Sequence, residues 1–110
     1  MSCKVTYTAH FRKEAKRLAK KHLSLKDDLA NLIVSLESDP EQGTPLGKGL
    51  YKIRLAIGSK GKGKSGGARV ITYLLLSDSL VYLTSIYDKA EQDSTETSSL
   101  LKILKEEGID

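Results

Sequence analysis

The stretch that decides the fold covers residues 50–87 and reads LYKIRLAIGSKGKGKSGGARVITYLLLSDSLVYLTSIY. In residues 50–57 an apolar side chain recurs at every second position, which is the period of a strand with one buried face. Lys52 and Arg54 occupy alternate positions, so the other face carries positive charge. These residues predict a half-buried strand with a basic face.

The second half of this stretch predicts two more strands. Residues 69–76 and 80–87 are apolar on both faces and rich in β-branched and aromatic side chains, as is typical of central strands. The three polar residues 77–79 between them predict a tight turn, which places Leu76 opposite Leu80. We therefore expect three consecutive antiparallel strands.

The far end of this hairpin gathers polar residues. The same register places Arg69 opposite Tyr87, and the preceding antiparallel strand brings Arg54 toward the same end. Lys89 follows the last strand, and the glycine- and lysine-rich residues 58–67 connect the first two. We expect one end of the sheet to present donors for phosphate oxygens.

Helices are predicted before these strands. Residues 4–7 are short and β-prone, and Thr8 offers an N-cap ahead of apolar residues that recur at helical spacing as far as His22. A second helix follows Ser24, whose spacing to Asp27 resembles a capping box. The two segments predict a helical hairpin.

Two further segments complete the predicted fold. Residues 40–49 contain two prolines and three glycines and predict a loop. Asp93, with Glu96 three residues later, predicts the cap of a last helix that stops at Gly108. The order βααβββα predicts a single α+β domain over residues 1–110, with an antiparallel sheet packed against the N-terminal helical hairpin and a short C-terminal helix.

The charge of the chain is unevenly distributed. The 110 residues carry a formal net charge of +4, and seven basic residues with no acidic one lie between Lys48 and Arg69. This density suits a polyanion such as nucleic acid, although a solvated basic face and a mobile solubilising loop remain alternatives. Cys3 is the only cysteine, and neither a signal peptide nor a membrane-spanning run is visible, so we expect a cytoplasmic protein without membrane contact.

Two nucleotide-binding patterns occur within residues 58–67, one matching a P-loop and one a dinucleotide fingerprint. Both motifs need a helix directly after the glycines, whereas a β-branched, aromatic run follows here. We therefore expect neither site. His10 and His22 do not share a helix face at ligand spacing, so no metal site is predicted.

Three stretches, together with the order of elements, resemble the RelE/ParE toxin superfamily and most closely its HigB-like branch. They are YKIRL at residues 51–55, GKGKSGGARVI at residues 61–71 and SIYDK at residues 85–89. The resemblance implies a toxin of a type II toxin–antitoxin pair that enters the ribosomal A site. There it would cut messenger RNA as an endoribonuclease, without a metal or other cofactor. A small helix-turn-helix antitoxin is the implied partner.

The resemblance also implies residue roles. A ribose 2′-hydroxyl would attack the adjacent phosphate while cations stabilise the phosphorane and an acid protonates the leaving oxygen. Arg54 and Arg69 match basic strand residues, with Arg69 as transition-state stabiliser, and Lys89 matches an acid or charge stabiliser. A lysine could be the base only if crowding by like charges lowers its pKa. The implied RNA-binding residues are Lys52, Lys60, Lys62 and Lys64.

One feature departs from the resemblance. RelE-like enzymes place a catalytic tyrosine in the last helix, where this chain has Thr95 or its neighbours. Tyr87 is the substitute candidate, either stacking on a base or assisting proton transfer, and a packed strand aromatic is the alternative. A second function also stays open, that of a non-catalytic ParE-like toxin that inhibits DNA gyrase.

Overall fold

The computed structural model describes residues 3–61, 63–64, 66–92 and 94–109. It confirms the predicted α+β order and adds one strand. The elements are β1 (Lys4–Tyr7), α1 (Ala9–Lys21), α2 (Leu25–Ser38), β2 (Thr44–Gly47), β3 (Leu50–Leu55), β4 (Ala68–Leu75), β5 (Leu80–Asp88) and α3 (Thr97–Glu106). Two short 3₁₀ turns, η1 (Gly58–Lys60) and η2 (Leu76–Asp78), lie after β3 and β4.

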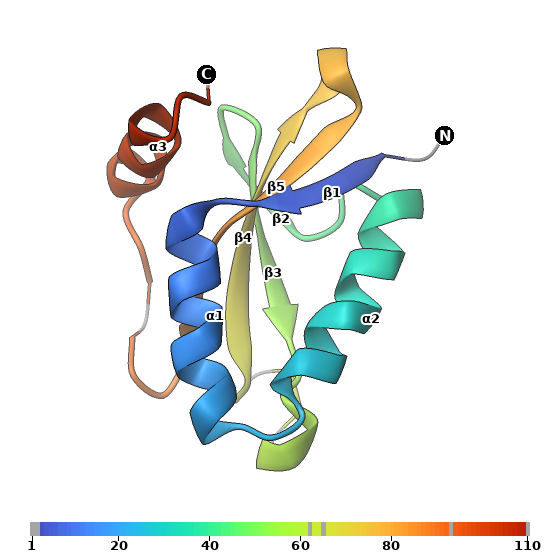
Figure 1. Ribbon diagram of the computed structural model, residues 1–110, viewed down its shortest axis with the longest axis vertical. Helices are drawn as coiled ribbons and strands as arrows, with labels where there is room; N and C mark the ends of the chain where they lie inside the picture. Colours follow the sequence, from blue (N-terminus) through green and yellow to red (C-terminus); the bar gives the residue numbers. More distant parts are fainter. Residues whose placement is uncertain (1–2, 62, 65, 93, 110) are drawn as a thin grey trace.

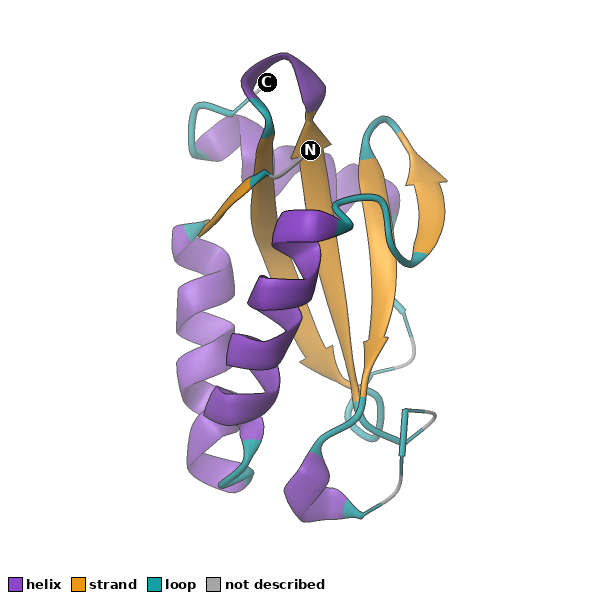
Figure 2. Ribbon diagram, turned by 90° about the vertical axis from the view of Figure 1, so that its right-hand side faces the viewer, coloured by secondary structure: helices purple, strands orange, loops and turns teal. Residues whose placement is uncertain are grey.

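The strands form one sheet in the order β1-β5-β4-β3-β2. The pairs β3–β4 and β4–β5 are antiparallel, as expected. β2 pairs with β3 in the antiparallel direction as well, and β1 adds to the edge of β5 in parallel. Helices α1 and α2 lie side by side on one face of the sheet, and α3 lies on the other (Figures 1 and 2). Within the described residues, every helix is too short or too polar to span a lipid bilayer.

Each face of the sheet has its own apolar cluster. The larger cluster lies under α1 and α2 and includes Leu18, Leu36 and Val70. The smaller lies under α3 and consists of Leu50, Ile71, Tyr87, Leu100 and Leu104. Because strand neighbours alternate between faces, β3 sends Ile53 to the larger cluster and Lys52 and Arg54 to the side of the smaller one. The α3 cluster therefore borders the basic face of β3.

The predicted loop of residues 40–49 contains a strand, so that prediction is wrong. β2 pairs with β3, with Thr44 opposite Lys52 and Pro45 opposite Tyr51. Pro45 is tolerated because β2 is the outermost strand, where the missing N–H need not serve a further neighbour. This pairing covers the first half of β3 and brings Thr44 beside the basic face.

The register of the last hairpin is confirmed at its far end and wrong near its turn. Arg69 lies opposite Tyr87, but Leu80 faces Leu75 rather than Leu76, which belongs to η2. A shift after Ile71 reconciles the two halves, because β5 has one extra residue there, Thr84, without a counterpart on β4. The bulge thus sets which residues meet at the basic end.

The N-terminal cap of α1 is confirmed and that of α2 is not. Thr8 is buried, and its Oγ1 accepts a hydrogen bond from the Phe11 N–H at 3.0 Å. The Ser24 hydroxyl accepts no hydrogen bond from a backbone N–H of α2 and instead donates one to the side chain of Asp28 at 2.8 Å. The expected capping box is replaced by a side-chain pair.

The last helix starts later than expected. It begins at Thr97 with Glu96 as the N-cap residue, and the predicted cap Asp93 lies outside the described residues. Its end agrees with the prediction, because Gly108 adopts a φ of 75° and its N–H bonds to the Lys105 carbonyl.

Gly67 allows three strands to approach each other at the basic end of the sheet. A Cβ at this position would lie 2.1 Å from the Leu55 carbonyl oxygen, a backbone atom that cannot rotate away. On its other side, the Gly67 carbonyl accepts the Lys89 N–H at 3.0 Å. Only glycine fits between these two segments.

We expect Gly67→Ala to lower the free energy of unfolding by about 3 kcal/mol, because backbone has to move to admit the methyl group. Gly58→Ala is the matched control, since its Cβ would come no closer than 3.4 Å to any neighbour. Its expected change is within about 0.5 kcal/mol. Urea unfolding measures both values, and equal stability of Gly67→Ala and the wild type would contradict the crowding.

Candidate anion-binding site

Arg54 and Arg69 lie directly opposite each other on β3 and β4. Paired residues of neighbouring strands point to the same face, so both side chains share the face on which α3 packs. Tyr87 is the partner of Arg69 on β5, which continues the row across three strands. The structure thus brings together three of the predicted site residues through strand register alone.

Four cations line one hollow on this face. The hollow has a volume of about 350 Å³ and is lined by Thr44, Lys52, Arg54, Arg69 and Lys89. Like charges at directly opposite positions of a sheet repel each other, so an anion bound between them would be stabilised. The described lining consists of these four cations and Thr44. The hollow is therefore suited to phosphate.

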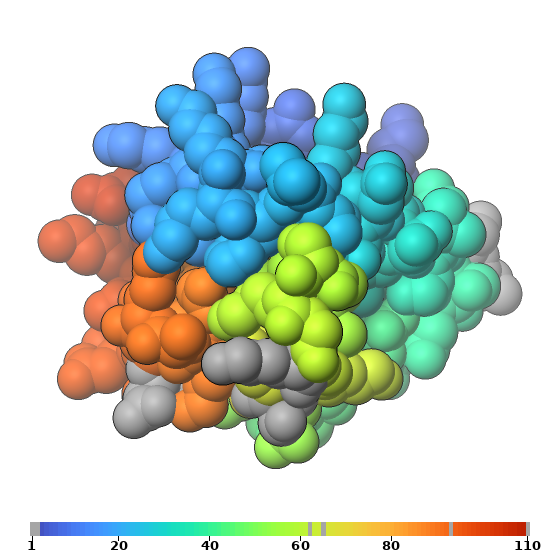
Figure 3. All heavy atoms as spheres, turned by 90° about the horizontal axis from the view of Figure 1, so that it is seen from below, coloured from blue at the N-terminus to red at the C-terminus, as the bar shows by residue number. Residues whose placement is uncertain are grey.

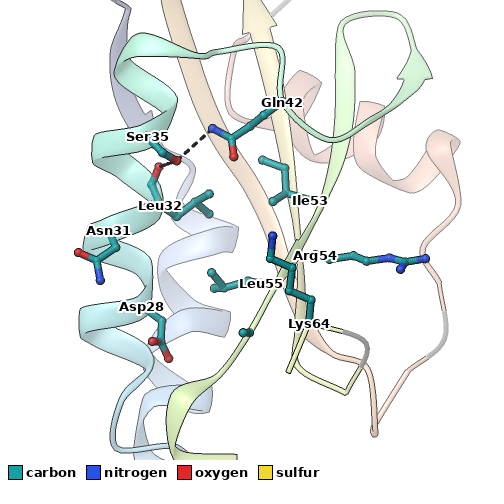
Figure 4. Close-up of a pocket in the computed structure, with 10 residues that line it drawn as sticks. Asp28, Asn31, Leu32, Ser35, Gln42, Ile53, Arg54, Leu55 and Lys64 are labelled. Atoms are coloured by element: carbon teal, nitrogen blue, oxygen red, sulfur yellow. Dashed lines mark hydrogen bonds between the residues drawn. The ribbon is translucent and has the colours of Figure 1, made fainter. Parts of the chain in front are cut away.

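Arg69 is held in place by backbone. Its side chain is buried, and Nη1 donates to the carbonyl oxygens of Lys64 at 3.0 Å and Ala68 at 3.2 Å. Arg54 is exposed at the strand end, and its side chain points to the opposite side of β3 from Ile53 and Leu55 (Figure 4). One arginine is thus anchored by the protein, while the other reaches into solvent.

Lys64 connects the cationic hollow to a groove beside α2. Its side chain runs along the edge of β3 (Figure 4) and, with Gln42 and Arg54, lines a second hollow of about 390 Å³. A third hollow of about 300 Å³ continues between α2 and β3, where Gln42 donates a hydrogen bond to Ser35. Lys64 therefore lies at the sheet edge, between the cationic hollow and the groove beside α2.

Lys60, another cation of the loop, does not line the described hollow. Lys60 donates to the Asp88 carboxylate at 2.8 Å, and its side chain is only 12% exposed. Lys62 lies outside the described residues. Lys48 sits in the turn between β2 and β3, at the opposite end of β3 from Arg54. Those of the seven cations that the structure describes thus lie in different places on the molecule.

Tyr87 and Lys89 flank Arg69 differently. Tyr87 is 3% exposed and packs in the α3 cluster, so its ring is not presented to solvent. Lys89 is half-buried and lines the hollow, and its backbone N–H donates to the Gly67 carbonyl. The structure brings the lysine to the cationic hollow and the tyrosine to its apolar border.

Asp88 is the residue that sequence reasoning missed. Its carboxylate is 2% exposed and accepts hydrogen bonds from Lys60 Nζ at 2.8 Å, His22 Nε2 at 3.0 Å and the Ala90 N–H at 2.9 Å. Burial by itself raises the pKa of this carboxyl, but the bonds from Lys60, Ala90 and His22 outweigh it and lower the pKa to about 2. In the sequence, the only indication of a role for Asp88 is its position next to Lys89.

His22 was expected to be an ordinary cap or surface residue. It is the C-cap of α1, but its ring is largely buried against Asp88. Among the described residues, no three of the His, Cys, Asp and Glu side chains gather closely enough to hold a metal ion. The strand β4 that begins at Ala68 also confirms that no helix follows the glycines at the spacing a P-loop needs.

Comparisons with known proteins agree with this architecture. A family model described as the RelE toxin of the RelE/RelB toxin–antitoxin system matches residues 4–107. A mutant of the E. coli toxin RelE with two arginines replaced by alanine, in the free state, is similar at a TM-score of 0.63 and 16% identity, covering 96% of this chain and 97% of that chain. The isolated E. coli RelE toxin is similar at 0.59 and 16%, covering 96% and 98%. The fold is therefore shared, and the comparisons do not single out the HigB-like branch.

The depressed pKa of Asp88 predicts a dependence of stability on acid. The folded state favours the ionised Asp88 carboxylate. Its contribution to the free energy of unfolding is therefore full above about pH 4 and is lost as the pH falls toward about 2. We expect the wild type to lose about 2 kcal/mol across this window from Asp88 alone. Urea unfolding between pH 5 and 2 measures it, and Asp88→Asn should show a correspondingly flatter profile. A variant profile as steep as that of the wild type would contradict the assignment.

Proposed function

The chain belongs to the RelE toxin family of RelE/RelB toxin–antitoxin systems, and from this premise we propose that it is a ribosome-dependent endoribonuclease that cleaves translated messenger RNA. The observation that carries the proposal is the convergence of four cations, from β3, β4 and the end of β5, on one hollow. Such a surface binds a phosphodiester and stabilises the extra charge that develops on it during cleavage. The proposed chemistry uses these cations on messenger RNA that the ribosome presents.

In the proposed reaction a ribose 2′-hydroxyl gives its proton to a base and attacks the adjacent phosphate. The bond from phosphorus to the 5′ oxygen breaks, and that oxygen is protonated as it leaves. Arg69 is the proposed stabiliser of the phosphorane, because its guanidinium is fixed by two carbonyls and needs no reorganisation when charge develops. Arg54 supplies a second charge from the opposite strand, and Lys89 is the proposed acid or charge stabiliser at the leaving oxygen. Tyr87 is proposed to support Arg69 from the apolar border of the site.

RNA on either side of the scissile phosphate would follow the cationic surface. Lys52 is the proposed contact within the hollow, and Lys64 the contact at the edge of β3. For Lys60 the ion pair with Asp88 supports a role in holding the loop, which is developed below. The predicted contact of Lys62 remains a proposal from the sequence resemblance.

Family membership also implies an antitoxin partner and a ribosomal target. We propose that the antitoxin is a small protein with a helix-turn-helix domain that covers the cationic hollow or excludes the toxin from the ribosomal A site. A protein neutralising this hollow would need acidic residues, since four cations have to be matched.

Cleavage of translated messages tests the function directly. In a translation reaction with purified ribosomes we expect wild-type protein to cut the message, and cutting to stop when an inhibitor occupies the A site. Arg69→Ala should lower the cleavage rate by about two orders of magnitude, the scale of one lost electrostatic stabiliser, and Arg54→Ala by about tenfold because its side chain is solvent-exposed. Mapping message 5′ ends over time measures the rates.

Lys105→Ala is the control for these arginine variants, since it removes an exposed cation on α3 that does not line the hollow. Its rate should equal that of the wild type. Undiminished cleavage by folded Arg69→Ala protein would contradict the proposed site. Intact messages during growth arrest, together with a DNA-damage response, would instead support the gyrase-inhibiting alternative.

Salt dependence tests the RNA surface independently of cleavage. If four cations meet phosphates of a short single-stranded RNA, the logarithm of the binding constant should fall with the logarithm of salt concentration at a slope of about −3. Engagement of all seven basic residues from Lys48 to Arg69 would give about −5. We expect Arg54→Ala to flatten the slope by about 0.7 and Lys48→Ala to leave it unchanged. A slope near zero would contradict a nucleic-acid surface.

A further inference from the structure

The Asp88 carboxylate lies directly behind the anion-binding site. Tyr87 and Lys89 belong to the α3 side of the sheet, whereas Asp88, between them and opposite Ala68, faces the side of α1 and α2. Its three hydrogen-bond donors come from η1, from the end of α1 and from the segment after β5. One buried carboxylate therefore joins three segments that are distant in the sequence.

The end view of the molecule shows this junction. In Figure 3 the yellow-green segment around residue 60 lies between the blue end of α1 and the orange segment that follows β5. The same segment is also fixed to α2, because the Gly58 N–H donates to Asp28 at 3.0 Å and the Ser59 N–H donates to Ser24 at 2.7 Å. Residues 58–60 are thus held by hydrogen bonds to α2 on one side and by the Lys60–Asp88 ion pair to the sheet on the other.

The same loop reaches the site twice. The Lys64 carbonyl accepts from Arg69 Nη1 at 3.0 Å, and the Gly67 carbonyl accepts from the Lys89 N–H at 3.0 Å. Lys89 is in addition the covalent neighbour of Asp88. Displacing the loop at Lys60 would therefore disturb hydrogen bonds to two of the four cations of the hollow.

We propose that Lys60 and Asp88 form a positioning pair, which holds the loop from behind the sheet so that Arg69 and Lys89 keep the geometry that phosphate requires. The catalytic part of this inference rests on the proposed function, whereas the positioning itself does not. Neither residue lines the described cationic hollow, so neither is assigned a contact with RNA.

Burial explains why the pair controls the loop. The side chains of Lys60 and Asp88 are only 12% and 3% exposed, so each charge depends on the other for its stability in the folded state. If Asp88 loses its charge, the buried Lys60 ammonium loses the partner that stabilises it, so this side chain moves toward water and displaces the loop backbone that carries it. The Lys64 carbonyl then moves with the loop.

Kinetics distinguish this positioning role from general stability. With saturating ribosomes, Asp88→Asn and Lys60→Met should each lower the maximal cleavage rate about tenfold, with ribosome affinity changed less than about twofold. The double variant should be no slower than either single variant, because both remove the same interaction. Lys60→Arg keeps the ion pair and should recover most of the rate.

Glu91→Gln is the matched control. Glu91 lies in the segment after β5 and pairs with Arg17 and Lys21 of α1, but no recorded contact in the described residues joins it to the loop. Its cleavage rate should equal that of the wild type. A tenfold loss in Glu91→Gln would overturn the specific role of the Lys60–Asp88 pair, since any carboxylate in this segment would then matter.

Hydrogen exchange provides a readout without catalysis. We expect Asp88→Asn to speed amide exchange of Lys89 about tenfold and to shift the side-chain NMR signals of Arg69, while amides of β1 keep their exchange rates. A lower unfolding midpoint with unchanged Lys89 exchange, Arg69 signals and cleavage rate would overturn the proposal. If the wild type does not cleave message at all, the proposed function fails, and the exchange and Arg69 measurements alone decide the positioning role.

Discussion

The side-by-side placement of Arg54 and Arg69 on neighbouring strands is the constraint on which the rest of the structure depends. Two guanidinium groups held at directly opposite positions repel each other, and Lys52 and Lys89 add to the repulsion. Such a site persists only if the surrounding fold is stable without it. The apolar clusters on both faces of the sheet supply that stability, and the second of them ends where the charges begin.

Several local features of the chain serve this placement. The bulge at Thr84 adjusts the register so that Arg69 meets Tyr87, and Gly67 lets β3 and the end of β5 approach from both sides. Carbonyl oxygens of Lys64 and Ala68 accept hydrogen bonds from the Arg69 guanidinium and orient it. An arginine held in a fixed orientation suits electrostatic stabilisation of a phosphorane, which is why the fold and the proposed reaction agree.

Similarity to E. coli RelE at 16% identity shows how few residues the fold itself requires. Family membership establishes a toxin of a toxin–antitoxin system, and the chemistry proposed here depends on the site of this particular chain. α3 (Thr97–Glu106) contains no tyrosine, so the proposed mechanism relies on cations rather than on an aromatic group of this helix. The pair behind the sheet, Lys60 and Asp88, then gains importance, because it supports two of those cations.

Apart from β2, the sequence by itself determined the order of elements, the basic face of β3 and the placement of Arg54 and Arg69 toward the same end of the sheet, since strand alternation and hairpin register are local properties of the chain. That the two arginines lie directly opposite each other was decided by the pairing of β3 with β4. The sequence did not predict β2, because a strand with proline and glycine is stable only at the edge of an existing sheet. It also did not predict that Lys60 would form an ion pair with Asp88 instead of lining the cationic hollow. Those two residues lie 28 positions apart, and their contact arises only when packing of α1, η1 and β5 buries one carboxylate among three donors. Tertiary structure decided it, because an ion pair between distant segments has no period or spacing in the sequence.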